Sequence, residues 1–428
     1  MKQNIGIIGL WHLGCVLSVS WSKLGHNVIG FDYDEKRAGD LNNGIPPIYE
    51  PNLVEEISKN IKSKKLKFTN NIKELDACDF IFLSYDTPVL DDDSSDTTIL
   101  EKSVSDVAKI MKDNSILIVS SQSPIGYCKN LRNILKSVNK TIDIAYSPEN
   151  LRLGEAINCY LNPGRIILGT NDDKTRKHCV ELFNEITADI ILMSLESAEM
   201  VKHGINSFLS TSIVFVNHLA DICESHNANI DDIIRGMKSD SRIGQKAYLS
   251  PGIGFSGGTL GRDLRVLEKA NNNGYAKLFE SVYKFNNERK HSIIKKFENI
   301  LGDLKGKKIA VLGVTYKPGT STLRRSLPLE IVELLIQKNC ELKVFDPKAD
   351  YKELNYVPEF TICNSIEEAV KNSDMIVLMT EWPEFIEYDW SKVIDKMNHN
   401  YFFDLKNVLD KSKMQNTGLL YFSLGRTV

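Results

Sequence analysis

The sequence predicts an α/β protein in which two Rossmann-like doubly wound domains are joined by a central helical domain with a long helix. Three observations support this prediction. Short apolar strands alternate with helical stretches near the N-terminus, the alternation stops in the middle of the chain, and it resumes near the C-terminus. Because such alternation is typical of βαβ units, each flanking region should form a parallel sheet. The predicted domains are residues 1–193, 194–300 and 301–428.

The strands of the first domain are short apolar runs separated by helical stretches. In order they read IGIIGL, NVIGFD, FIFLSY, SILIVSS, DIAYSP and RIILG. The middle domain contains ESAEMVKHGINSFLSTSIVFVNHLADICESH, in which apolar residues recur at helical spacing without proline. We expect a long helix there, suited to joining domains and to pairing subunits as a homodimer. The last domain contains KKIAVLGV, ELKVFDP, MIVLMTEW and YFFDLK, again alternating with helices.

The 428 residues carry a formal net charge of −3, with Lys and Arg scattered rather than clustered, which argues against a nucleic-acid partner. The chain starts directly in an apolar strand and has no apolar run long enough to span a bilayer, so we expect a cytoplasmic protein without a membrane partner. Its eight cysteines occur singly, which predicts reduced, mostly buried thiols and no metal site. We expect a solvated loop at the acidic cluster Asp91, Asp92, Asp93 and Asp96.

A dinucleotide fingerprint opens the first domain. Strand IGIIG ends in Gly9, Gly14 follows at the start of an apolar helix, and Asp32 closes the next strand. The free N–H groups of the helix N-terminus should bind a pyrophosphate, and Asp32 should accept the ribose hydroxyls while repelling a 2′-phosphate. We therefore predict NAD as the cofactor. The middle glycine of the fingerprint is replaced by Trp11, followed by His12 and Leu13, and we expect these three residues to line the cofactor site between Gly9 and Gly14. For the His12 side chain, solvation or packing is a simpler interpretation than catalysis.

Further segments resemble the UDP-glucose/GDP-mannose dehydrogenase family over almost the whole chain. In the first domain these are NNGIPPIYEPNL at 42–53, Tyr85-Asp86-Thr87-Pro88, the run from Tyr146 to Arg152, and Pro163-Gly164-Arg165. The run ESAE at 196–199 then leads to Lys202 and Asn206. In the last domain they are Gly313-Val314-Thr315-Tyr316-Lys317-Pro318 with Thr320 and Arg324, Phe345-Asp346-Pro347, and Thr380-Glu381-Trp382. The order and spacing of these segments carry the resemblance.

Oxidising an alcohol needs a base, donors for the developing oxyanion and a nicotinamide held over the carbon. The resemblance implies that Lys202 and Asn206, four apart on one helix face, hold the sugar oxygen, and that Asp263 orders a water that takes the proton. It implies an acid/base role for Glu149, for which an N-cap or salt bridge is a competing interpretation. It further implies cofactor contacts from Thr87, Gln122, Lys317 and Arg324, and nucleotide-sugar contacts from Glu149, Leu151, Arg152, Arg242 of a partner subunit, Tyr248, Gly254, Phe255 and Gly258.

One departure from the family concerns its second oxidation. Residues 252–263, GIGFSGGTLGRD, resemble the family loop GxGFGGSCFPKD without gaps, so that Thr259 replaces the catalytic cysteine. A thiolate adds to an aldehyde and allows a second hydride transfer, whereas a threonine hydroxyl is far less acidic. Gln122 replaces a threonine of the loop STxPxG, and Arg262 replaces a lysine. These clustered changes indicate altered chemistry.

The residues support three functional hypotheses. The first is NAD-dependent oxidation of a nucleotide-activated sugar, with a UDP-sugar favoured and UDP-glucose 6-dehydrogenase as the pattern. The second is a single hydride transfer that gives an aldehyde or keto-sugar, or an oxidation and reduction that changes its configuration. The third is a non-catalytic homologue that binds nucleotide sugar and NAD, against which the presence of Lys202, Asn206 and Asp263 argues.

Overall fold

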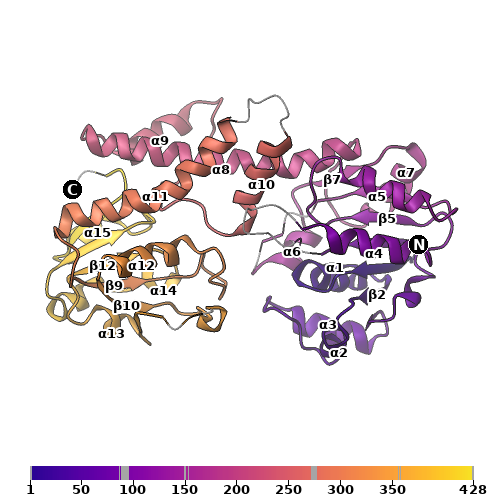
Figure 1. The fold of residues 1–428 in the computed structure, drawn as a ribbon, viewed down its shortest axis with the longest axis horizontal. Helices are drawn as coiled ribbons and strands as arrows, with labels where there is room; N and C mark the ends of the chain where they lie inside the picture. The colour runs from indigo at the N-terminus through magenta and orange to yellow at the C-terminus, as the bar shows by residue number, and fades with distance from the viewer. Residues whose placement is uncertain are drawn as a thin grey trace. The chain divides into compact units, whose positions relative to one another are not determined.

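The computed structural model describes residues 2–85, 87, 96–148, 151–152, 154–270, 277–354, 356 and 358–426. The chain divides into two compact units, Met1–Gly204 and Ile205–Val428. Each unit contains one twisted, mainly parallel sheet between helices (Figure 1), so the predicted α/β class with two Rossmann-like sheets is confirmed. The three predicted domain boundaries, 1–193, 194–300 and 301–428, stay predictions.

The first unit has an eight-stranded sheet in the order β3-β2-β1-β4-β5-β6-β7-β8, parallel throughout except between β6 and β7. The order of its first six strands, 3-2-1-4-5-6, is that of a dinucleotide-binding sheet. The strand order reverses between β1 and β4, although these two strands are parallel. The strands are β1 Asn4–Ile8, β2 Asn27–Phe31, β3 Leu66–Thr69, β4 Phe80–Leu83, β5 Ile116–Val119, β6 Asp143–Tyr146, β7 Ile166–Gly169 and β8 Ile190–Met193.

Helices cover both faces of this sheet. The helices are α1 His12–Lys23, α2 Glu35–Asn42, α3 Leu53–Lys62, α4 Thr98–Ala108, α5 Tyr127–Lys136, α6 Ala156–Leu161 and α7 Asp173–Phe183. Apolar side chains of α1, α3, α6 and α7 form the core on one face, and those of α4 and α5 form the core on the other. Central strands such as β4 and β5 are buried on both faces, which explains their continuous apolar sequences.

The second unit contains a six-stranded, fully parallel sheet in the order β11-β10-β9-β12-β13-β14. Its strands are β9 Lys308–Leu312, β10 Glu341–Phe345, β11 Thr361–Ile362, β12 Met375–Leu378, β13 Tyr401–Asp404 and β14 Leu420–Ser423. Among its helices are α9 Ile230–Ser239, α10 Gly258–Ala270, α11 Lys277–Leu301, α12 Leu327–Gln337, α13 Ile366–Val370, α14 Pro383–Ile386 and α15 Lys411–Gln415.

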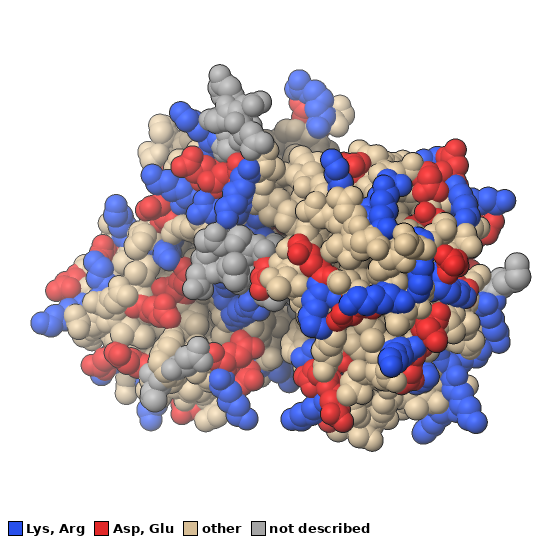
Figure 2. Space-filling model, turned by 45° about the vertical axis from the view of Figure 1, so that its right-hand side comes forward, with Lys and Arg blue, Asp and Glu red and all other residues tan. Residues whose placement is uncertain are grey.

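The predicted long central helix is present as α8, Leu195–Ser225, which starts in the first unit and continues into the second. Its 31 residues contain no proline, so the backbone hydrogen bonds of the helix are uninterrupted. In the described part of the chain, no helix has the length and apolarity needed to cross a membrane. On the face shown in Figure 2, basic and acidic side chains alternate instead of gathering in one patch.

None of the eight cysteines, all of which lie in the described ranges, forms a disulfide. Burial raises the pKa of the Cys78 thiol to about 12 and that of Cys179 to about 12, so both stay protonated at neutral pH. Cys159 is partly exposed and lines a cavity of about 50 Å³ in the first unit. Of the acidic cluster, Asp96 accepts a hydrogen bond from the Thr98 N–H, and Asp91, Asp92 and Asp93 lie outside the described residues.

Candidate active site

The turn between β1 and α1 has the geometry that a dinucleotide pyrophosphate needs. Gly9 has φ +94°, which favours glycine, and a Cβ atom on Gly14 would lie 1.8 Å from the Gly9 carbonyl oxygen. Helix α1 begins at His12, and the side chain of its N-cap residue, Trp11, makes no capping hydrogen bond. The first N–H groups of the helix therefore remain available for an anion at the helix N-terminus.

The carboxylate of Asp32 is buried beside this turn, with a residue exposure of 3%. Its Oδ2 accepts the Leu10 N–H at 2.8 Å and an Arg37 guanidinium N–H at 3.1 Å. Arg37 also pairs with Asp34 at 3.6 Å, and its guanidinium lies 5.4 Å from the ring centroid of Trp11. The indole therefore lies against Arg37, at the position where the family fingerprint has its middle glycine.

These residues fit NAD. Two carboxylates, Asp32 and Asp34, face one guanidinium, so the local charge stays negative and disfavours a 2′-phosphate. The glycine turn, the uncapped helix N-terminus and a strand-end acid are the groups that bind a dinucleotide in this fold. Arg37 was not identified from the sequence. Its position three residues after Asp34, the N-cap residue of α2, is the signal that could have placed it beside the two carboxylates.

The imidazole of His12 contacts a buried carboxylate. Its Nε2 lies 2.9 Å from Oε2 of Glu50, whose exposure is 3%. Glu50 also accepts the N–H groups of Gly154 at 3.0 Å and Ala156 at 2.8 Å, at the start of α6. This contact agrees with the interpretation of His12 as a packed side chain. Sequence reasoning missed Glu50, although it lies in the segment NNGIPPIYEPNL that carried the resemblance.

The loop that follows β5 carries Gln122. The hydroxyl of Thr87, which follows β4, donates to the Gln122 carbonyl at 2.5 Å, so these two predicted cofactor contacts lie together. Ser121 donates from its hydroxyl to the Leu83 carbonyl at 3.1 Å and is fully buried. The loop therefore lies at the carboxyl ends of β4 and β5, where dinucleotides bind in doubly wound sheets.

In the second unit, two of the predicted catalytic side chains are in direct contact. The Asn206 amide on α8 donates a hydrogen bond to the Asp263 carboxylate on α10. Asn206 is 7% exposed and Asp263 is fully buried, so the pair is shielded from solvent. The Arg262 Nε lies 3.9 Å from Asp263 Oδ1. Lys202, four residues before Asn206 on the same helix, belongs to the first unit, and its proximity to Asp263 stays a prediction.

The loop at 252–257 is held by side chains of α11. Asn286 accepts the Phe255 N–H at 2.8 Å and donates to the Phe255 carbonyl at 3.0 Å. Arg289 donates to the Gly252 carbonyl at 3.3 Å and pairs with Asp221 of α8. Sequence reasoning missed Asn286 and Arg289, because α11 shows only an ordinary helical pattern.

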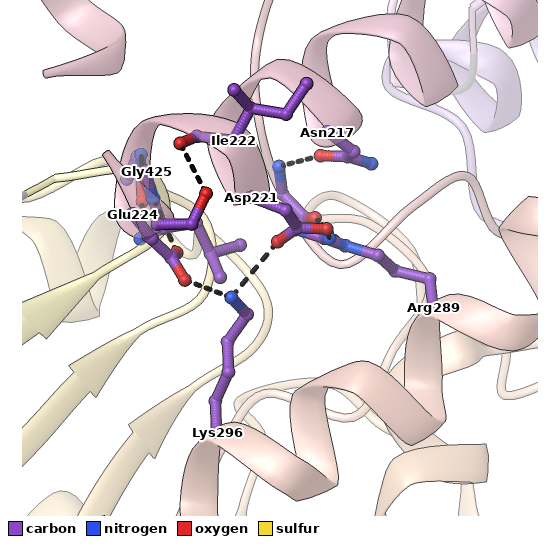
Figure 3. Close-up of polar contacts among 11 residues, drawn as sticks. Asn217, Asp221, Ile222, Glu224, Arg289, Lys296 and Gly425 are labelled. Carbon is purple, nitrogen blue, oxygen red and sulfur yellow. Dashed lines mark hydrogen bonds and ion pairs between the residues drawn. The ribbon is translucent and has the colours of Figure 1, made fainter. Parts of the chain in front are cut away.

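A chain of ion pairs extends this contact along α8 (Figure 3). Lys296 of α11 lies 3.0 Å from Asp221 and also pairs with Glu224. Glu224 accepts the Gly425 N–H at 2.8 Å, which attaches the end of the last strand to the central helices. Loop 252–257 and the C-terminal sheet of this unit are therefore both attached to α8 and α11.

Residues 314–327 of the second unit contact the same loop. The Gly257 N–H donates to the Arg325 carbonyl at 2.9 Å, and the Leu327 N–H donates to the Ser256 hydroxyl oxygen at 2.9 Å. Lys317 lies 5.6 Å from the ring centroid of Tyr316, and Arg324 is exposed. The two predicted cations thus belong to a loop that touches the loop of Gly254, Phe255 and Gly258.

The remaining predicted residues have varied surroundings. Thr259 is exposed on the first turn of α10. Arg242 is exposed, and its pairing with Asp240 at 2.6 Å raises the pKa of its guanidinium. Tyr248 and Arg152 are exposed, whereas Leu151 packs against the first core. Glu149 lies outside the described residues, and its role stays a prediction.

Comparison with known proteins agrees with this architecture. Three sequence models of the UDP-glucose/GDP-mannose dehydrogenase family match: its NAD binding domain at residues 3–187, its central domain at 196–288 and its UDP binding domain at 310–411. A UDP-glucose 6-dehydrogenase of Rickettsia felis is 34% identical over 438 residues, covering 99% of this chain and 96% of the relative. One from Bacillus subtilis is 32% identical over 431 residues, covering 99% and 93%.

A solved structure shows the same fold. The UDP-glucose dehydrogenase of Pyrobaculum islandicum superposes with a TM-score of 0.89 and 24% identity, covering 100% of this chain and 98% of that one. The glycine turn beside Asp32 has the geometry of a dinucleotide site, and Asn206 and Asp263 form a buried polar pair. The chain therefore belongs to the UDP-glucose/GDP-mannose dehydrogenase family and is an NAD-dependent nucleotide-sugar dehydrogenase.

Proposed function

We propose that the enzyme oxidises the primary alcohol of a UDP-sugar of the UDP-glucose type. The buried contact between Asn206 and Asp263 carries this proposal, because it joins two predicted catalytic groups that are far apart in sequence. Support for the substrate comes from the UDP binding domain of the family at residues 310–411 and from relatives that are UDP-glucose 6-dehydrogenases.

In the proposed reaction, the carbon gives a hydride to the nicotinamide while the hydroxyl loses its proton. Lys202 and Asn206 would donate hydrogen bonds to the oxygen as negative charge develops on it. Asp263 would order the water that accepts the proton, as the resemblance implies. The contact with the Asn206 amide supports this role, because it holds the Asp263 carboxylate in one orientation.

We propose further that oxidation stops at the aldehyde. Thr259 takes the place of the family cysteine, and its neighbours from 252 to 263 include no cysteine. Without a thiolate, the thiohemiacetal that precedes the second hydride transfer cannot form. The observed burial of Cys78 and Cys179 keeps those thiols protonated and supports the view that they supply no substitute.

Incubation with NAD and a panel of UDP- and GDP-sugars tests both proposals when NADH absorbance and product mass are followed together. We expect one NADH per sugar and an aldehyde product. Two NADH and a uronic acid would exclude the one-step proposal, because each NADH accounts for one hydride taken from the sugar. NAD binding without turnover of any sugar would contradict the substrate proposal.

Three variants assign the roles. Lys202→Ala should lose at least about 100-fold in kcat, because removing one oxyanion donor costs that much in other enzymes. Thr259→Ala should stay within about threefold of wild type, if the hydroxyl makes no bond to the reacting atoms. Thr259→Cys should gain acid product; without that gain, Gln122 or Arg262 also blocks the second step.

We propose that two chains pair through α8. Phe208, Phe215 and Ile222 are seven residues apart on this helix and are 70%, 47% and 54% exposed. A seven-residue spacing places these side chains on one face of a helix, as at a helix–helix interface. Phe215→Asp should convert a dimer into a monomer in sedimentation, and an unchanged dimer would contradict this interface.

We also propose a cytoplasmic role in polysaccharide biosynthesis, supported by the activity of the UDP-glucose 6-dehydrogenase relatives. Deleting the gene should reduce a surface polysaccharide that contains the oxidised sugar, and fractionation should recover the protein with cytoplasmic enzymes. An unchanged polysaccharide composition in the deletion strain would contradict this role.

A further inference from the structure

Two buried polar side chains on the first turns of α8 take no part in the proposed reaction. Glu199 is fully buried and His203 is 1% exposed. They are four residues apart, so they lie on one face of the helix, and Lys202 lies between them in sequence. Glu199 belongs to the run ESAE, whose function the sequence did not explain.

Glu199 caps a different helix. Its carboxylate accepts the Gly126 N–H at 2.5 Å and the Cys128 N–H at 2.7 Å, at the start of α5. Gly126, the N-cap residue of α5, has no side chain that could cap these groups. Negative charge is stabilised at a helix N-terminus, and two N–H donors compensate the carboxylate for the water lost on burial.

His203 holds the residues just before this helix. Its Nε2 donates to the Ser123 carbonyl at 2.9 Å, and Ser123 is 1% exposed. On the opposite side, Thr87 donates to the Gln122 carbonyl at 2.5 Å. Residues 120–126 are therefore fixed between the end of β4 and the first turns of α8.

We propose that Glu199 and His203 are positioning residues that lock loop 120–126, and with it Gln122, to the turn of α8 that bears Lys202. Every contact in this lock lies within the first unit, which also binds NAD. The inference rests on the expected contact between Gln122 and the cofactor. Its consequence is that the hydride acceptor and the Lys202 ammonium keep a fixed separation.

Glu199→Gln tests the carboxylate, because an amide oxygen accepts only at one end and its NH2 group would face the second N–H donor. Glu196→Gln is the matched control, since Glu196 is exposed on the same turn of α8. We expect Glu199→Gln to lower kcat about 10- to 100-fold and to weaken NAD binding several-fold by calorimetry, with a smaller change in KM for the sugar nucleotide. Glu196→Gln should match wild type in all three quantities.

Two variants test whether the hydrogen-bond donor of His203 is needed. His203→Gln keeps a donor that can reach the Ser123 carbonyl and should retain most of kcat, whereas His203→Leu removes the donor and should not. In a background of Gln122→Ala, the loss caused by Glu199→Gln should shrink at least threefold if the two residues act on the same loop.

The outcomes separate a positioning role of Glu199 from an effect on folding stability alone. Asp404→Asn removes another fully buried carboxylate, at the end of β13, and should leave kcat and NAD affinity unchanged whatever its effect on the Tm. If Glu199→Gln lowers the Tm but leaves kcat and NAD affinity at wild-type values, the proposal is wrong. If Gln122→Ala leaves NAD affinity unchanged, the placement of Gln122 fails; loss of kcat in Glu199→Gln would then still identify Glu199 as a positioning residue for Lys202.

Discussion

The two sheets of this enzyme begin with the same turn and use it differently. Gly9 after β1 and Gly313 after β9 have φ +94° and +87°, and each donates its N–H to the carbonyl that ends the neighbouring strand at 2.9 Å. Asp32 and Asp346 each come directly after that neighbouring strand. In both cases Oδ2 accepts the N–H of the residue after the glycine at 2.8 Å.

The two turns differ in the chain that leaves the glycine. Helix α1 starts three residues after Gly9, whereas the long loop 314–326 separates Gly313 from α12. Asp346 accepts the N–H and hydroxyl of Thr315 at 2.9 Å and lies 3.3 Å from the Trp382 indole nitrogen, and its other oxygen accepts two further backbone N–H groups. Its acceptor sites are used to hold the loop. A strand-end acid therefore indicates a dinucleotide only where a helix N-terminus lies next to it.

The largest effect should come from filling the two turns. A Cβ atom on Gly313 would lie 2.4 Å from the Thr380 Cβ, and one on Gly9 would lie 2.8 Å from the Tyr85 ring, both at positive φ. We expect Gly9→Ala and Gly313→Ala each to lower the free energy of unfolding by about 3 kcal/mol, from backbone strain and overpacking. Urea denaturation measures this change, and a loss below about 1 kcal/mol would mean that the turns can relax.

Replacing each of the two acids, Asp32 and Asp346, by asparagine should separate their roles. Asp346→Asn should cost about 2 kcal/mol of stability and raise the KM for the UDP-sugar, because one amide cannot accept all of the N–H groups at Asp346. Asp32→Asn should instead weaken NAD binding about tenfold, equivalent to about 1.4 kcal/mol. Calorimetric titration with NAD compares the two variants. Weaker NAD binding in Asp346→Asn would break the distinction drawn between the turns.

A smaller effect is expected where loop 314–326 contacts loop 252–257. Ser256→Gly removes the acceptor for the Leu327 N–H and installs the residue that the family loop has at this position. We expect about 1 kcal/mol less stability, the usual net contribution of a hydrogen bond, and a few-fold higher KM for the UDP-sugar. Ser256→Thr, which keeps a hydroxyl, is the control and should stay near wild type.

The last effect depends on pH and concerns Asp404, the acid that ends β13. Burial raises its pKa, outweighing the hydrogen bonds that it accepts from Leu409, Lys406 and Tyr421. A raised pKa in the folded state gives stability that is full below the unfolded value near 3.8 and is lost as pH rises through the folded value. Relative to Asp404→Asn, wild type should therefore lose stability as pH rises from about 4 toward neutrality. A constant difference across urea denaturation series at these pH values would count against this.

Local patterns in the chain were enough to predict the fold class and the family, and to propose a candidate site. Strand and helix periodicities are local, so the two mainly parallel sheets and the long helix α8 could be predicted from them, but not the antiparallel pairing of β6 with β7. Glycine and acid spacing located the NAD turn, and the loop at 252–263 brought Asp263 into the same hypothesis as Asn206.

The way these groups are held became visible only in the folded chain. Three of the contacts that hold the site join distant parts of the chain. They are His12 with Glu50, 38 residues apart, Cys128 with Glu199, 71 residues apart, and Phe255 with Asn286, 31 residues apart. Such contacts leave no periodic trace, because a buried carboxylate or amide has the same local sequence pattern whichever backbone it meets. The need to satisfy every buried polar group selects those partners, and that need is met only when distant segments pack together.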